Sequence, residues 1–407
     1  MTSRAGAQDR VPSNFVFISS NFVWGGSEEL WSEAAAVMAA RGHRVTVYKN
    51  RLSLREGNVA AMRAASCTIV ELARFPFLPN QIYSLAAKFA QPVSIAYQAL
   101  RLHLCLRLRR RPALVVVSQG GNHDGWLLAT VCRRLGLPYV LVSQKATDLY
   151  WPDDRWLEQI RTMYAEARHA FFVAEHNLQL AQEQIGATLP RASVVRNPFK
   201  VDWAAPKPWP PGELCRFACV GRLYPKEKGQ DLLLRVLAKD KWRRRPVSLT
   251  VFGAGEQRRG LEAMAAYLGL RSVRFAGYAD DIDALWEQHH ALVLPSRAEG
   301  LPLVVVEAML SGRVAIVTDV GGNAEAVADN VTGFVAAAPT EAALDEAMER
   351  AWQRRMEWPE IGCRAAASMR RAVPPNPAAA FADQLLRIAS GESVSGPADE
   401  PFAEAAE

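Results

Sequence analysis

Short apolar runs alternate with longer amphipathic stretches along most of the chain. Residues 27–42 and 125–136 have helical spacing, and each ends at a glycine, a common helix stop. Near-continuous apolar strands joined by helices are typical of a parallel sheet covered on both faces. The pattern predicts strands in the first half at 15–19, 44–48, 68–72, 113–118, 139–143 and 169–174.

The same rhythm restarts after a proline-rich segment, 201–213. The second half predicts strands at 216–221, 247–253, 272–277, 291–296 and 313–318. At 407 residues the chain is too long for one ordinary core, so two doubly wound α/β domains are expected. The predicted parts are a disordered N-terminus (1–13), a first domain (14–200), a linker (201–213), a second domain (214–373), a helix crossing back to the first domain (374–390) and an acidic disordered tail (391–407).

Composition excludes several classes of protein. Half of the residues are hydrophobic and 22% are charged, which is typical of globular domains. No apolar run reaches the roughly 20 residues of a spanning helix and no signal segment is evident, so a cytoplasmic protein is expected. The six cysteines form no C-x-x-C pair, and no metal site is predicted.

The net charge of +6 hides a basic body. The acidic tail holds five carboxylates and neither Lys nor Arg, so residues 1–390 carry +11. Such a body attracts nucleotide phosphates, phospholipid headgroups or nucleic acid, and charge alone does not choose among them. Nucleic acid is the least favoured partner, because no recognised binding module is evident.

Two carboxylates, Glu299 and Glu307, bracket the segment EGLPLVVVE. The segment follows the predicted strand 291–296 and enters a helix, with Pro302 suited to the first helical position. The free N–H groups near Gly300 and Leu301 can bind phosphate or sugar oxygens. Carboxylates beside such a site suit sugar hydroxyls, so a nucleotide-sugar pocket is predicted. For the two glutamates taken alone, solvated surface acids are the simpler interpretation.

Two cations follow the first strand of the second half. Arg222 comes at the strand end and Lys228 near a helix start in GRLYPKEKGQDLLL, where both can face one pyrophosphate. Lys226 is a competitor that is expected to be solvated. Gly253 belongs to a G-x-G fragment that lacks a third glycine, so it predicts a turn lining the nucleotide cleft and not an NAD site.

Other loops offer weaker candidates. Gly25 and Gly26 follow the first strand, where they suit either close approach to a phosphate or a tight turn. His123, beside Asp124, can orient an acceptor hydroxyl or cap the next helix. Glu325 is expected to be structural.

Two further segments allow two interpretations each. In 147–156 the aromatic residues Tyr150, Trp151 and Trp156 can stack on sugar rings or pack in a core. Residues 101–111 carry five arginines among leucines, which fits a helix lying on an anionic membrane. The favoured interpretation of 101–111 is an ordinary helix whose basic C-terminal end complements the helix dipole.

Taken together, these motifs resemble the retaining glycosyltransferases of family four, which have the two-domain GT-B fold. The resemblance is strongest over 215–335, where GRLYPKEKGQDLLL, VFGAGE, ALVLPSRAEGLPLVVVEAM and VGGNAEAVADNVTGFV occur in the family's order. It implies transfer of a sugar from a nucleoside diphosphate donor, UDP- or GDP-linked, to a glycan, lipid-linked or small-molecule acceptor. Family members retain the anomeric configuration and need no metal, and no cofactor is expected.

The resemblance also implies roles for individual residues. Glu307 would bind the ribose hydroxyls, and Glu299 would contact the transferred sugar. Arg222 and Lys228 would hold the pyrophosphate. The donor would also meet the backbone of Gly25, Gly26, Gly300, Leu301, Pro302 and Leu303.

One departure concerns the first half. The family often has a histidine directly after the strand at 113–118, and that position holds Gln119 here. His123 would have to act from four residues further on. A second common histidine corresponds to Gln144. A non-catalytic nucleotide-sugar or membrane-binding relative and a sugar-nucleotide epimerase of the same fold therefore stay open as alternatives.

Overall fold

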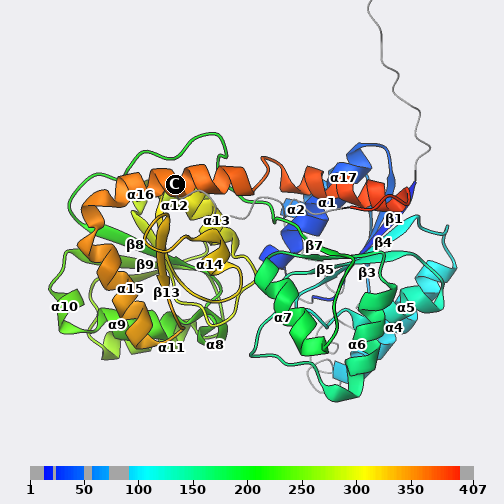
Figure 1. Cartoon of the computed structure of the whole chain (residues 1–407), viewed down its shortest axis with the longest axis horizontal. Helices are drawn as coiled ribbons and strands as arrows, with labels where there is room; N and C mark the ends of the chain where they lie inside the picture. Colours follow the sequence, from blue (N-terminus) through cyan, green and yellow to red (C-terminus); the bar gives the residue numbers. More distant parts are fainter. Residues whose placement is uncertain (1–12, 22–23, 50–56, 73–90, 395–407) are drawn as a thin grey trace, which may run out of the picture. The chain divides into compact units, whose positions relative to one another are not determined.

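The computed structural model describes residues 13–21, 24–49, 57–72 and 91–394 (Figure 1). Most of the predicted N-terminal segment, 1–13, and of the predicted acidic tail, 391–407, lies outside the described residues. Among the helices that the structure describes, none is both long and apolar enough to span a bilayer.

One sheet has seven strands in the order β3-β2-β1-β4-β5-β6-β7 (Figure 1). Its central strand β1 pairs in parallel with β2 on one side and with β4 on the other. All six strands predicted in the first half are present, and only the three-residue β7 was not predicted. The strands are β1 (Asn14–Ser19), β2 (Arg44–Lys49), β3 (Thr68–Glu71), β4 (Leu114–Gln119), β5 (Tyr139–Ser143), β6 (His169–Phe172) and β7 (Ala192–Val194).

Helices connect these strands. The predicted helices at 27–42 and 125–136 are found with slightly shorter bounds, as α1 and α5. The described helices are η1 (Gly26–Glu28), α1 (Glu29–Ala40), α2 (Gly57–Ala64), α4 (Gln91–Arg107), α5 (Trp126–Arg134), η2 (Asp154–Trp156), α6 (Leu157–Glu166) and α7 (Glu175–Ile185).

The second sheet has six parallel strands in the order β10-β9-β8-β11-β12-β13. Strand order reverses between β8 and β11, and ligands of doubly wound sheets bind beyond the carboxyl ends of the strands at such a point. The five predicted strands are confirmed. The strands are β8 (Cys215–Val220), β9 (Val247–Phe252), β10 (Val273–Gly277), β11 (Ala291–Leu294), β12 (Val314–Thr318) and β13 (Gly333–Ala336).

The helices of this half cover both faces of the second sheet. They are α8 (Pro225–Lys228), α9 (Gln230–Leu237), α10 (Asp240–Arg243), α11 (Arg258–Tyr267), α12 (Ile282–Gln288), α13 (Leu303–Leu310), α14 (Asn323–Ala326), α15 (Glu341–Gln353), η3 (Arg355–Glu357) and α16 (Trp358–Ala372). A last helix, α17 (Pro377–Ala389), follows.

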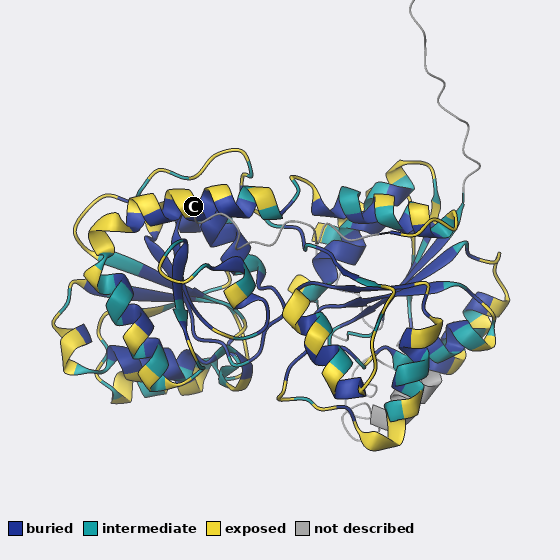
Figure 2. Ribbon diagram, in the orientation of Figure 1, coloured by how far each residue is buried: buried dark blue, intermediate teal, exposed yellow. Residues whose placement is uncertain are grey.

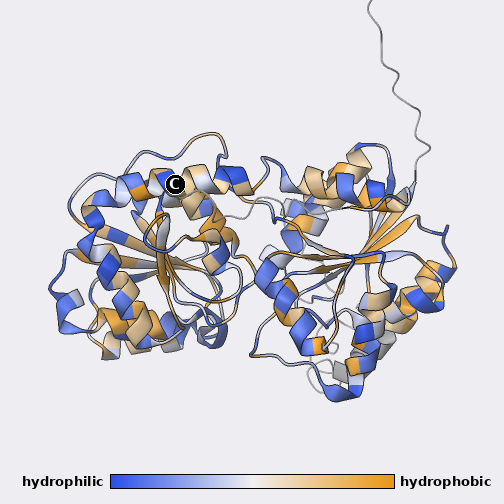
Figure 3. Cartoon of the chain, in the orientation of Figure 1, coloured by the Kyte–Doolittle hydropathy of each residue, from blue (hydrophilic) through white to orange (hydrophobic). Residues whose placement is uncertain are grey.

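The core of the second sheet is built by alternation along each strand. In β11, Val293 joins the cluster that includes Leu233 of α9, whereas Leu292 joins the cluster that includes Val306 of α13. The residues of both clusters are buried, and the central strands of this sheet are mostly dark in Figure 2 and mostly orange in Figure 3. Burial on both faces explains why the central strand β11 is apolar throughout, whereas the edge strand β10 is only partly buried and contains Arg274.

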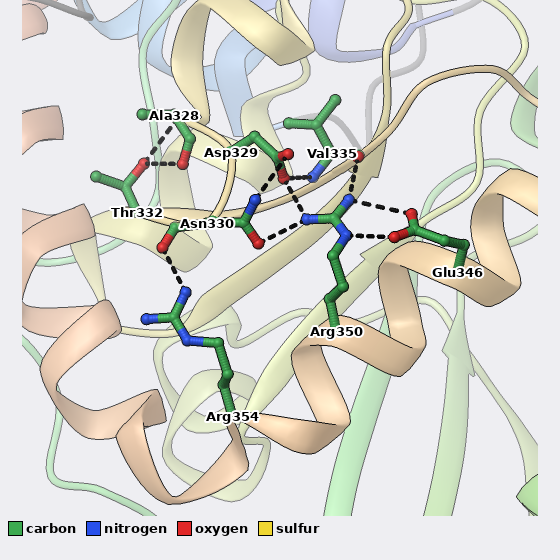
Figure 4. A network of polar contacts seen from close by, with 8 residues as sticks. All are labelled: Ala328, Asp329, Asn330, Thr332, Val335, Glu346, Arg350 and Arg354. Atoms are coloured by element: carbon green, nitrogen blue, oxygen red, sulfur yellow. Dashed lines mark hydrogen bonds and ion pairs between the residues drawn. The ribbon is translucent and has the colours of Figure 1, made fainter.

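The edge strand β13 depends on a polar network that the sequence did not reveal (Figure 4). Asn330 has a left-handed backbone, with φ of 62°, in the turn before β13. The Arg350 guanidinium donates to Asp329 Oδ1 at 2.8 Å, to Asn330 Oδ1 at 2.7 Å and to the Val335 carbonyl at 2.9 Å. A cation from α15 therefore fixes the turn that starts this strand.

The chain divides into two compact units. Of the described residues, unit 1 takes those up to Val142, together with Glu158–Ala170 and Ala378–Val394. Unit 2 takes Ser143–Leu157 and Phe171–Pro377. The loop after β5 thus belongs to unit 2, and nearly all of α17 belongs to unit 1.

The proline-rich segment 201–213 has neither helix nor strand and is held within unit 2. Arg313, with 1% of its surface exposed, donates to the carbonyls of Trp286, Lys207 and Pro208. A buried guanidinium needs such acceptors, because an unpaired charge in the interior is strongly unfavourable. The segment is therefore anchored by its backbone and not by apolar packing alone.

Candidate functional site

The candidate site of unit 2 lies where the strand order of the six-stranded sheet reverses. β8 and β11 are neighbours there, and the loops that follow them contain Arg222 and Glu299. Parallel strands end at the same edge, so the two loops meet. The fold thus brings together residues 77 positions apart in sequence.

Glu299 is a buried acid paired with a cation. Its side chain is 6% exposed, and Oε1 lies 2.6 Å from Nζ of Lys228, the last residue of α8. The hydroxyl of Ser296 donates to the same oxygen at 2.6 Å. The interpretation of Glu299 as a solvated surface acid was therefore wrong.

Glu307 is also buried, with 5% of its surface exposed, in the second turn of α13. Its Oε1 accepts a hydrogen bond from the backbone N–H of Lys200 at 3.1 Å. The surface interpretation was wrong for Glu307 as well. A correction concerns Pro302, which has φ of −67° and ψ of 127° and precedes the first helical residue, Leu303. Because its backbone is extended, Pro302 caps α13 from outside.

The Glu299–Gly300 loop is packed backbone against backbone. A side chain at Gly300 would place Cβ 2.1 Å from the Gln144 carbonyl oxygen. A side chain at Gly321 would meet the Glu299 carbonyl oxygen at 2.4 Å, and Gly322 N–H donates to the Gly300 carbonyl at 2.7 Å. Glycine is required here because three chain segments meet without room for a side chain.

Gly253 serves a similar purpose. Its φ is 131°, and a Cβ would lie 1.9 Å from the Gly221 carbonyl oxygen. The turn after β9 thus supports the turn that carries Arg222. Its predicted place on the nucleotide remains a prediction.

A second charged cluster surrounds Glu227, a residue of α8 that the sequence analysis did not single out. The Glu227 carboxylate meets Lys145 at 3.0 Å, Arg222 at 3.3 Å and the hydroxyl of Tyr150 at 3.0 Å. Burial acts to raise the pKa of Glu227, but Lys145 and Arg222 outweigh it and hold the pKa below its usual value. Arg222 keeps a side chain that is 61% exposed, so it is tethered without being covered.

Lys145 and Lys226 complete this cluster. Lys226 Nζ lies 5.0 Å from the centre of the Tyr150 ring and Lys145 Nζ lies 5.6 Å from it. Lys226 is exposed, as expected, and it lies beside the candidate site. No sequence signal identified Lys145, because it follows a strand of the other sheet and reaches Glu227 only through folding.

Glu325 has a structural contact, in line with its interpretation from sequence. Its two carboxylate oxygens accept the N–H groups of Glu175 and His176 at 3.0 and 2.6 Å. These groups open α7, where free N–H donors and the helix dipole favour an acid.

In unit 1 the loop after β1 contacts a buried ion pair. Lys49 Nζ lies 2.8 Å from Glu28 Oε2, and both side chains are fully buried. Ser19 and Asn21 also donate to the Glu28 carboxylate, at 2.9 and 2.7 Å. Burial lowers the pKa of Lys49, even though the nearby carboxylate acts to raise it.

Gly25 and Gly26 are exposed in this loop. Gly25 has an extended backbone with φ of −168°, and no described atom lies within 4 Å of where its Cβ would be. The protein's own packing at the described residues therefore does not require glycine at Gly25. The Gly25 carbonyl accepts from Glu28 N–H at 2.9 Å, a turn contact, so the tight-turn interpretation stands and a ligand contact at Gly25 remains a prediction.

The loop after β4 holds His123, which is half-buried. Its Nδ1 lies 2.9 Å from Asn122 Oδ1, and burial lowers its pKa although Asp124 acts to raise it. Asp124 itself accepts from the Ser20 hydroxyl at 2.9 Å and from Gly121 N–H at 3.0 Å. Asp124 is therefore tied to the fold.

Gln119 is fully buried and engaged within unit 1. Its Oε1 accepts from Gly125 N–H at 3.0 Å, at the start of α5, and its Nε2 donates to the Tyr164 hydroxyl at 3.0 Å. Its amide organises the loop that carries His123.

The predicted site residues fall into two groups. Arg222, Lys228, Gly253, Glu299 and the loop to Glu307 come together in unit 2, whereas Gly25, Gly26 and His123 belong to unit 1. Within the part of the chain that the structure describes, no group of three or more His, Cys, Asp or Glu residues has the arrangement of a metal site.

Comparison with known proteins finds a family match for most of the second half of the chain. Residues 215–354 match the family model "Glycosyl transferases group 1". The chain carries a glycosyltransferase group 1 domain. This domain contains Arg222, Lys228, Glu299 and Glu307, and the match confirms the resemblance to glycosyltransferases for residues 215–354.

Curated relatives of the group 1 domain match part of their length. The chain is 26% identical over 229 residues to a glycogen synthase of Mycobacterium tuberculosis, covering 56% of this chain and 50% of that protein. It is 34% identical over 160 residues to the D-rhamnosyltransferase WbpZ of Pseudomonas aeruginosa, covering 38% of this chain and 40% of that protein. The chain thus spans about half or less of these relatives.

Solved structures match across both sheets. The Anabaena protein Alr3699/HepE, in complex with UDP and glucose, is 17% identical, with a TM-score of 0.71 over 93% of this chain and 99% of that one. The sucrose-phosphate synthase of Thermosynechococcus elongatus is 15% identical, with a TM-score of 0.71 over 93% of this chain and all of that one. At these identities the likeness shows the fold, which is GT-B.

Proposed function

We propose that this protein is a glycosyltransferase that moves a sugar from a nucleoside diphosphate donor to a glycan, lipid-linked or small-molecule acceptor. The observation that carries the proposal is the ion pair between Lys228 and Glu299, buried at the carboxyl edge of a group 1 domain. In this pair an ammonium group, which suits a phosphate, lies beside a carboxylate, which suits a hydroxyl. A nucleotide sugar presents its phosphates and its sugar hydroxyls at the same short spacing.

We assign the contacts of the donor to four residues of unit 2. The Glu307 carboxylate accepts hydrogen bonds from the ribose, and Glu299 accepts them from the transferred sugar. Arg222 and Lys228 hold the pyrophosphate, helped by the backbone at Gly300. UDP- and GDP-linked donors are proposed first. A solved relative of the same fold holds UDP, and a matching relative is named a GDP-mannose-dependent mannosyltransferase.

The cationic residues are proposed to stabilise the negative charge that forms on the leaving diphosphate. When the bond between the sugar C1 and the phosphate oxygen breaks, negative charge builds on the diphosphate, and fixed cations lower the barrier. The acceptor oxygen bonds to C1 on the same face, and its proton passes to the departing phosphate oxygen, so the anomeric configuration is retained. Because Arg222, Lys228 and Lys145 supply positive charge, turnover is proposed to need no divalent cation.

Unit 1 has candidate residues of its own. Gly25 and Gly26 are proposed to admit a phosphate to the backbone of their loop, and the buried pair of Lys49 and Glu28 holds that loop in place. His123 orients a hydroxyl of the donor sugar or of the acceptor. Since burial lowers its pKa, it is neutral near pH 7 and can accept or donate one hydrogen bond.

The experiment that tests this function measures nucleotide release from UDP-, GDP-, ADP- and dTDP-linked sugars, with and without a lipid and glycan extract. Release from one donor that rises with extract supports a transferase. The anomeric signal of the product in NMR then tests retention, and EDTA tests metal independence. Binding of a donor with no release under any condition would favour the non-catalytic alternative.

A further inference from the structure

The segment after β5 presents an unusual tryptophan beside the charged cluster of Glu227. The chain has eleven tryptophans, all in described residues, and only Trp151 and Trp156 are exposed, by 59% and 40%. A large aromatic side chain exposed to solvent loses the burial that normally stabilises it, so its position needs another explanation.

The backbone that carries Trp151 is anchored on both sides. Before it, the Tyr150 hydroxyl donates to Glu227 and the Tyr150 N–H donates to the Thr147 carbonyl at 3.3 Å. Gln184 of α7 donates to the same carbonyl at 3.0 Å. After it, Pro152 is buried. The ring is therefore displayed from a fixed backbone, which reduces the entropy lost on binding a ligand.

The charges around Trp151 indicate what it binds. Asp148 and Asp154 are exposed within three residues on either side, whereas the exposed Asp153 is paired with Arg155 at 2.6 Å. Carboxylates accept hydrogen bonds from hydroxyl groups, and a surface that mixes both signs of charge has no strong attraction for the anionic headgroups of a phospholipid surface. An aromatic face among carboxylates fits a neutral sugar ring, whose C–H groups stack on the ring while its hydroxyls bond to the acids.

We propose that Trp151 and the carboxylates beside it form the acceptor subsite, and that the acceptor is a neutral glycan. The proposal rests on the proposed function and adds to it the chemical class of the acceptor. Tyr150 joins the two sites directly, since its neighbour Trp151 contacts the acceptor while its hydroxyl contacts Glu227, the partner of Arg222. Trp151 is thus one residue along the chain from Tyr150, which lies beside the cations proposed to hold the donor's pyrophosphate.

The test is binding of the full chain to polysaccharides in native gels cast with glycogen, dextran or mannan. At least one should retard the wild-type protein. Trp151→Ala should weaken that binding about 2- to 13-fold, which is the range that loss of one stacked aromatic contact allows, and Trp151→Phe should retain part of it. Tyr267→Ala is the matched control, because Tyr267 is 89% exposed on α11 and should not affect binding.

Donor binding separates this proposal from the function on which it rests. Trp151→Ala should leave the affinity for the donor nucleotide within twofold of wild type. If the wild-type protein binds a donor but no polysaccharide retards it, the glycan subsite is wrong while the transferase function stands. If no nucleotide sugar binds, the function itself fails. Weaker binding of Trp151→Ala to phosphatidylcholine vesicles, with unchanged retardation, would show a lipid-contacting loop and overturn the proposal.

Discussion

Lys228 Nζ and Glu299 Oε1 lie 2.6 Å apart, although 71 residues separate them in sequence. α8 ends at Lys228, and the loop after β11 contains Glu299. Their pairing gives the buried carboxylate a counter-charge and holds the ammonium in place. A donor that brings its own phosphates and hydroxyls can engage both partners at once.

Replacing Lys228 by alanine should lower kcat/KM by about 100- to 1000-fold, the usual effect of removing one group that stabilises developing charge. The neighbouring Lys226→Ala is the control and should change kcat/KM less than tenfold. Steady-state kinetics with the identified donor measure both. Equal losses in the two variants would mean that the general positive field matters and not the pair with Glu299.

Substitutions of Glu307 and Glu299 should affect different kinetic constants. Glu307→Gln should raise the donor KM and weaken nucleotide binding, because it contacts the ribose in ground state and transition state alike. Glu299→Gln should mainly lower kcat, because its contact is with the reacting sugar. Isothermal titration with the free nucleotide, followed by kinetics, distinguishes them. Small and equal effects on nucleotide affinity, KM and kcat would show that both glutamates have a structural role only.

Gly300→Ala should lower donor affinity and destabilise the protein by about 1–3 kcal/mol, the usual cost of overpacking. The new Cβ would lie 2.1 Å from the Gln144 carbonyl oxygen, and a backbone atom has little room to move. Gly260→Ala is the control, since α11 contains Gly260 and, beyond its chain neighbours and its own helix backbone, no described atom lies within 4 Å of its Cβ position. It should stabilise the helix by up to about 1 kcal/mol. Urea unfolding measures both, and equal stability would show that the loop adapts.

His290 should make the protein less stable in mild acid. Its Nδ1 accepts from Arg216 N–H at 3.1 Å while Nε2 lies 3.1 Å from the Pro210 carbonyl, so the neutral ring satisfies both partners. Burial, with Arg216 nearby, lowers the pKa of His290 from 6.5 to about 4.

The unfolded chain therefore binds a proton at this residue between pH 6.5 and 4, whereas the folded one does not. Stability should fall as pH decreases through this window, by up to about 3 kcal/mol. His290→Asn should flatten that dependence in urea unfolding at several pH values. Parallel curves for variant and wild type would contradict the assignment.

The basic segment 101–111 retains two interpretations. α4 ends at Arg107 with a basic last turn, and Leu104 and Leu108 are 49% and 83% exposed. If the segment binds an anionic membrane, reversing Arg109, Arg110 and Arg111 to glutamate should lower binding to phosphatidylglycerol vesicles by about tenfold or more. Neutral phosphatidylcholine vesicles are the control. Unchanged binding would leave a helix whose basic end complements its dipole.

The sequence by itself determined the two doubly wound sheets, because strands buried on both faces must be apolar and helices between them must be amphipathic. It also identified Arg222, Lys228, Glu299 and Glu307 as candidates, since they follow strand ends in a recognisable order. It missed the three-residue β7 and the edge strand β13, whose starting turn is held by Arg350 from α15.

Only the tertiary structure decided which candidate groups meet. Burial of Glu299 and Glu307 follows from packing of their loop and helix against segments distant in sequence, and no local pattern encodes it. The same holds for Lys145 and Tyr150, which reach Glu227 because the loop after β5 folds onto α8. Periodicity reports how one segment meets the core, whereas a charged site is made of contacts between segments, and those exist only once the chain has folded.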